Sequence, residues 1–92
     1  MDDIFEVLEG LKKEHPDKIQ LIDQCLRSVS LWLNIRGSDV PKSSYLVECY
    51  KFVISELDEF IPKGWWNIFK AWAFKTLVKY IVKKLLESLV EN

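Results

Sequence analysis

The sequence predicts an all-α protein, a compact antiparallel four-helix bundle with a short first helix and a long C-terminal helix. Isolated glycines and prolines divide the 92 residues into four segments. Every apolar run between these residues has a helical rather than a strand period. The connections are short, which favours antiparallel neighbouring helices around one core. We therefore expect a single helical domain over residues 1–92.

The first two helices are predicted over residues 3–13 and 16–35. An aspartate at the start caps the first helix, whose apolar residues recur at helical spacing: Ile4, Phe5, Leu8 and Leu11. Pro16 suits the first turn of the second helix, and Gly37 is expected as its left-handed C-terminal stop. The apolar stripe of this helix is predicted to contain Ile19, Ile22, Leu26, Val29 and Leu33, widened by Leu21, Cys25 and Trp32.

The last two helices are predicted over residues 41–60 and 65–90. Pro41 begins the third helix and the sequence IPKG ends it. Its core-facing residues are expected to be Leu46, Cys49, Val53, Leu57 and Phe60. The fourth helix contains no helix-breaking residue. Its core stripe is predicted to be Phe74, Leu77, Val78, Ile81, Leu85 and Leu89, with Lys75, Lys79, Lys83 and Glu87 on the opposite side.

The start of the fourth helix carries a second apolar stripe: Trp65, Ile68, Phe69 and Trp72. On a helical wheel this stripe lies roughly opposite the core stripe, so the apolar side of the helix changes near Ala73. A single helix packed on a single core cannot bury both stripes. The aromatic stripe therefore needs a second cover.

Four covers remain open for this stripe. The acidic first helix could fold over it within the same chain, or a second copy or another protein could bind it. A membrane surface would suit tryptophan beside lysine, although the acidic remainder of the chain would be repelled by anionic lipid. Nucleic acid is the least favoured partner, since the chain has eleven lysines but only two arginines.

Charge is distributed unevenly along the chain. Residues 1–62 contain seven Lys/Arg and twelve Asp/Glu, whereas residues 63–92 contain six Lys/Arg and two Asp/Glu. The two parts therefore attract each other. Low arginine with high lysine is compatible with an AT-rich microbial or viral genome.

The two cysteines are predicted to lie at similar heights on facing helices. Cys25 precedes Ser38, in the connection between the helices, by thirteen residues, and Cys49 follows it by eleven. A disulfide is geometrically allowed. The alternative is a pair of free thiols that serve as small core residues.

No constellation in the sequence indicates catalysis. The single histidine, His15, stands beside a proline, and it forms no metal-ligand spacing with the two cysteines. The three glycines are isolated, so the sequence has no phosphate-binding loop. We expect no enzyme activity, no cofactor, no metal and no small-molecule substrate.

We therefore predict a small non-catalytic protein that binds another protein or self-associates as a homodimer. The aromatic anchors are predicted to be Trp65, Trp66, Phe69 and Trp72, and the polar rim Glu56, Asp58, Glu59, Lys63 and Lys70. The alternative is a peripheral membrane protein of the immunity or lysis-modulating type that uses the Trp/Lys-rich last helix. The acidic N-terminal stretch does not match a signal peptide, and lysines interrupt the last helix, so we expect a cytoplasmic protein without a transmembrane helix.

Overall fold

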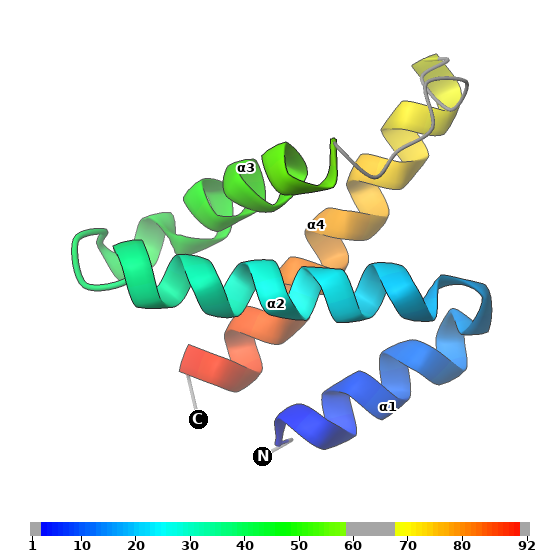
Figure 1. The fold of residues 1–92 in the computed structure, drawn as a ribbon, viewed down its shortest axis with the longest axis horizontal. Coiled ribbons are helices and arrows are strands. Elements are labelled where there is room, and N and C mark those ends of the chain that lie inside the picture. The colour runs from blue at the N-terminus through cyan, green and yellow to red at the C-terminus, as the bar shows by residue number, and fades with distance from the viewer. Residues whose placement is uncertain (1–2, 59–67, 91–92) are drawn as a thin grey trace.

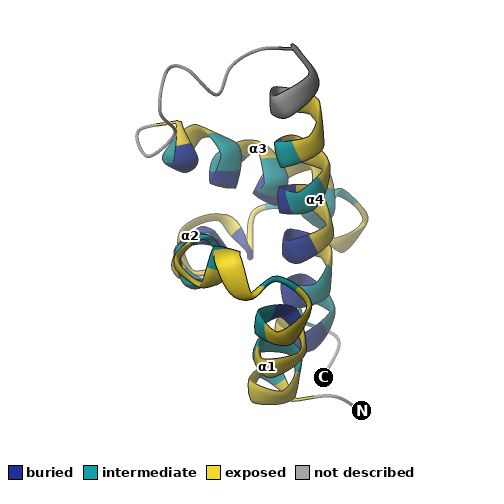
Figure 2. Cartoon of the chain, turned by 90° about the vertical axis from the view of Figure 1, so that its right-hand side faces the viewer, coloured by how far each residue is buried: buried dark blue, intermediate teal, exposed yellow. Residues whose placement is uncertain are grey.

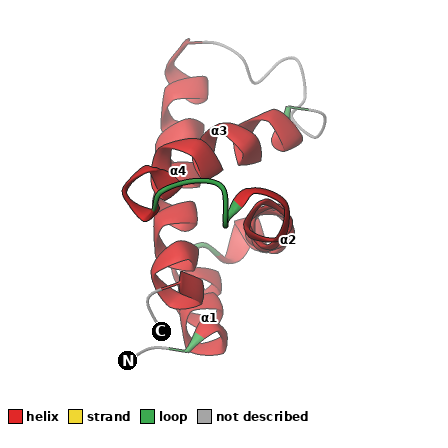
Figure 3. Ribbon diagram, turned by 90° about the vertical axis from the view of Figure 1, so that its left-hand side faces the viewer, coloured by secondary structure: helices red, strands yellow, loops and turns green. Residues whose placement is uncertain are grey.

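The structure, a computed structural model, describes residues 3–58 and 68–90, and within the last helix it describes side chains from Trp72 onward. These residues form four α-helices and contain no strand (Figure 3). The helices are α1 (Ile4–Glu14), α2 (Ile19–Arg36), α3 (Tyr45–Leu57) and α4 (Ile68–Val90). The prediction of an all-α protein with four helices is confirmed, with a short first helix and a long last one.

The helix α4 crosses behind α2 and touches each of the other three helices (Figure 1). Helices α1 and α2 run in opposite directions, as do α2 and α3. The crossing is oblique, so the first half of α4 extends past α2 beside the end of α3. The last half of α4 packs beside α1. The two ends of α4 therefore have different neighbours.

The core is a continuous apolar cluster along the inner side of α4 (Figure 2). The predicted core residues Val78, Ile81 and Leu85 are fully buried. Two buried residues, Val82 and Leu86, were absent from the predicted stripe, because three helices surround α4 and bury a wider arc than a single seam. Leu89 was expected in the core and is 37% exposed.

Two other apolar residues expected in the core lie on the surface. Phe5 is 74% exposed, since the inner side of α1 is occupied by Ile4, Val7, Leu8 and Leu11. Ile19 begins α2 and is 44% exposed. Further along α2, the fully or nearly fully buried apolar residues are Ile22, Cys25, Val29 and Trp32, whereas Leu26 and Leu33 are half-buried.

Pro16 and Pro41 introduce short 3-10 turns instead of α-helical turns. Pro16–Lys18 forms η1 before α2, and Lys42–Ser44, directly after Pro41, forms η2 before α3. Proline lacks an N–H and restricts the residue before it, which suits a tight turn ahead of a helix. Both α-helices consequently start later than predicted, and α3 ends at Leu57.

The connection between α2 and α3 is held by an aromatic contact. The Tyr45 hydroxyl donates a hydrogen bond to the carbonyl of Gly37, and its ring meets Trp32 edge-on with centroids 5.1 Å apart. The predicted left-handed conformation of Gly37 is wrong, since its φ of −57° and ψ of −37° continue the helix. Glycine is favoured for space instead, because a Cβ there would collide with the carbonyl of Leu33.

Truncating a core residue of α4 should be far more costly than truncating its exposed neighbour. We expect Leu85→Ala to lower the free energy of unfolding by about 2–5 kcal/mol, because Leu85 is fully buried. The control Leu89→Ala, on the same helix, should cost less than about 1 kcal/mol. Urea unfolding followed by circular dichroism measures both, and equal losses would contradict this assignment of the core.

Candidate binding face on α4

Trp72 lies on the outer side of α4 and is 67% exposed. It precedes Val78, the first fully buried residue among the described side chains of α4, by six positions, which places the two about 120° apart around the helix. Four more exposed side chains lie on this side. Together they form what we call the Trp72 face: Trp72, Lys75, Thr76, Lys79 and Lys83.

The first helix does not cover Trp72. In Figures 1 and 2, α1 packs beside the C-terminal half of α4, away from the end that carries Trp72. Its position is fixed by the apolar residues that join the core, and a partly exposed ion pair joins Lys12 to Asp23 of α2, with Nζ and Oδ1 3.0 Å apart. Cover by the first helix of the same chain, one of the four alternatives, is therefore not formed at this tryptophan.

The Trp72 face is basic. Neither Lys79 nor Lys83 forms an ion pair within the part of the chain that the structure describes. Lys84 lies outside this face, about 120° around the helix from Trp72, with Nζ 5.7 Å from the centre of the Tyr80 ring. Thr76 turns inward on its own helix, where its hydroxyl donates to the carbonyl of Trp72 at 2.9 Å. The face therefore offers an exposed indole followed by positive charges.

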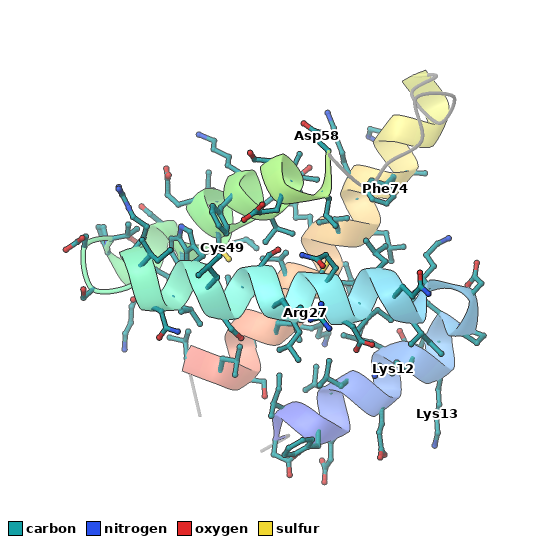
Figure 4. The ribbon with its side chains drawn as sticks, in the orientation of Figure 1. Lys12, Lys13, Arg27, Cys49, Asp58 and Phe74 are labelled. Carbon is teal, nitrogen blue, oxygen red and sulfur yellow. The ribbon has the colours of Figure 1, made fainter. Side chains whose placement is uncertain are left out.

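The predicted polar rim is described only in part. Asp58 is exposed at the end of α3, where its N–H donates to the carbonyl of Ile54 (Figure 4). Glu56 is half-buried, and the last turn of α3 contains no basic residue. The predicted residues Trp65, Trp66, Glu59 and Lys63 lie outside the described residues. Phe69 and Lys70 belong to α4, but their side chains are outside the description.

Cys25 of α2 and Cys49 of α3 (labelled in Figure 4) are both free and fully buried. Burial raises the pKa of each thiol to about 12, and the proximity of Cys49 contributes further to the raised pKa of Cys25. Both thiols are therefore neutral at physiological pH. A neutral, enclosed thiol is a poor nucleophile, so these residues act as core residues in this state.

A surface cleft that sequence reasoning missed lies where the start of α3 meets the end of α4. Its volume is about 470 Å³. It is lined by Lys42, Tyr45, Leu46, Lys83, Leu86, Glu87 and Val90. The residues come from segments forty positions apart, which no local pattern joins. The cleft shares Lys83 with the Trp72 face.

Within residues 3–58 and 68–90, no group of three or more His, Cys, Asp or Glu side chains is arranged to hold a metal ion. None of the helices described here combines the length and the apolar character needed to cross a membrane. Comparisons of the chain with protein-family models, with curated proteins and with solved structures find no match.

The buried thiols should make stability depend on alkaline pH. In the unfolded chain a thiol has a pKa near 9, whereas in the folded protein the pKa of each thiol is about 12. Between these values the thiols are protonated in the folded state and ionised in the unfolded state, so the folded protein becomes less stable as the pH rises. We expect the free energy of unfolding to fall between pH 9 and pH 12 more steeply in the native protein than in a Cys25→Ala, Cys49→Ala variant. Urea unfolding at several pH values measures this, and parallel profiles would contradict it.

Proposed function

We propose that this protein is a non-catalytic binding protein that engages another polypeptide through the Trp72 face. The observation that supports this most is the indole of Trp72, 67% exposed on a helix whose other side is locked into the core. Tryptophan is among the residues that contribute most to protein–protein binding, because it buries a large area with few rotatable bonds.

The position of Trp72 also favours a binding role over a packing role. α4 is continuous from Ile68 to Val90, so Trp72 is held on a rigid scaffold. Because the helix is already ordered, covering Trp72 with a partner costs little conformational entropy of α4. Lys79 and Lys83 lie one and two turns beyond the Thr76 position and would favour an acidic partner surface.

A membrane surface is the second candidate. Tryptophan and lysines on one side of a helix suit the headgroup region of a bilayer. Against this candidate, one described aromatic residue on the Trp72 face is a small apolar area to insert. The acidic residues of α1 and of the end of α3 would also be repelled by anionic lipid.

A photoreactive side chain at position 72 tests the proposal. We replace Trp72 with benzoylphenylalanine, irradiate cells of the source organism, and purify the protein under denaturing conditions. We expect a covalent adduct with a polypeptide, because the probe stands where the partner is proposed to dock. Mass spectrometry identifies whether the adduct is another protein, a second copy or a lipid.

The same probe at Val47 is the matched control, since Val47 is also an apolar residue on a helix and is 51% exposed. Polypeptide adducts at position 72 that are absent at position 47 support the proposal. Adducts with lipid alone favour the membrane candidate. Equal labelling at both positions, or no adduct at either, contradicts the proposed function.

A further inference from the structure

The outer side of α1 is complementary to the Trp72 face. Phe5 is 74% exposed, and Glu6 and Glu9 are exposed beside it. These three residues form what we call the Phe5 face. The Phe5 face combines an exposed phenyl ring with two carboxylates and borders the exposed Lys13, whereas the Trp72 face combines an exposed indole with lysines. Neither Glu6 nor Glu9 forms an ion pair with a described residue.

We propose that the Phe5 face of one copy docks on the Trp72 face of a second copy. This inference rests on the proposed function and names the partner as the same chain. Opposite charges on the two faces favour the contact and set its register, while Phe5 and Trp72 supply the apolar area.

The same pairing cannot form within one chain. The inner side of α1 is committed to the core through Ile4, Val7, Leu8 and Leu11, and Lys12 near its other end forms a partly exposed ion pair with Asp23 of α2. This position leaves α1 beside the C-terminal half of α4 (Figure 1). The carboxylates of α1 therefore do not reach the lysines of the Trp72 face in the same molecule.

A twofold arrangement lets both contacts form at once. The start of α1, which carries Phe5, and the start of α4, which carries Trp72, lie toward opposite ends of the molecule (Figure 1), so an antiparallel pair of copies places each α1 start near the α4 start of the other.

The contact depends on exposed charges, so it should weaken with salt. At 0.5 M NaCl the Debye length is only about 4 Å, compared with roughly 14 Å at 50 mM. We expect sedimentation equilibrium to show a concentration-dependent monomer–dimer equilibrium at 50 mM NaCl, with a dissociation constant that rises at least tenfold at 0.5 M.

Charge reversal tests the pairing itself. One variant carries Lys79→Glu and Lys83→Glu, and the other carries Glu6→Lys and Glu9→Lys. Each variant alone places like charges on both faces and should remain monomeric at concentrations where the native chain dimerises. Mixed in equal amounts, the two variants place opposite charges on both pairs of faces, and we expect a heterodimer.

Matched controls carry the same charge changes elsewhere on the surface: Lys42→Glu with Lys51→Glu, and Asp39→Lys with Glu48→Lys. All four positions are exposed, so the control variants should dimerise as the native chain does. Circular dichroism with an unchanged unfolding midpoint verifies that each variant is folded. A monomeric native chain, variants that dimerise alone, or a mixture that stays monomeric would each overturn the proposal.

The two proposals fail in different ways. If the native chain is monomeric and the probe at position 72 captures a different polypeptide, pairing between copies is wrong and the proposed function stands. If position 72 captures no polypeptide, both are wrong. Capture of a second copy at position 72, together with the heterodimer of the charge-reversed variants, supports both.

Discussion

Packing of one side of α4 against three helices is the constraint on which the rest of the structure depends. Val78, Ile81 and Leu85 are fully buried, and the other helices contribute their buried residues to the same cluster. Most of the stability of a helix in a small domain comes from burying such a side rather than from its intrinsic propensity. Because a straight helix presents one side to one core, the outer side of α4 is left to solvent or to a partner.

The oblique crossing of α4 then separates its two halves. α1 takes the place beside the C-terminal half, and the first half extends beyond α2 (Figure 1). Trp72 stands in this first half, and the carboxylates of the Phe5 face are exposed. An acidic helix and a basic helix within one chain are thus both held by apolar packing, and each keeps an exposed charged side.

The helical pattern of the sequence was sufficient to predict the four helices and much of the core. Val78 and Cys49 were placed correctly because residues three and four apart share one side of a helix. Phe5 was misplaced because its neighbour Ile4 satisfies the same pattern, and only the position of α1 decides which of the two is covered. The conformation of Gly37 was misjudged for a similar reason, since the Tyr45 contact that closes this connection is made eight residues further along the chain.

The candidate face was predictable only where it follows from a helical wheel. The exposure of Trp72 and of the lysines after it follows from the angle that they make with the core stripe. The helical wheel does not predict which segment covers the face, because this depends on how α1 is connected and packed. The cleft between α3 and α4 was also beyond prediction, since Lys42 and Lys83 are brought together only by the crossing of two helices.

The most direct measurement of the central claim is hydroxyl-radical footprinting of the folded protein at low concentration, with oxidation of each tryptophan read by mass spectrometry. It compares Trp72, which is 67% exposed, with Trp32, which is 4% exposed, in one unmodified chain. The account predicts that Trp72 is oxidised at least tenfold faster than Trp32. Equal protection of the two indoles would show that the chain covers its own aromatic face and would contradict the account.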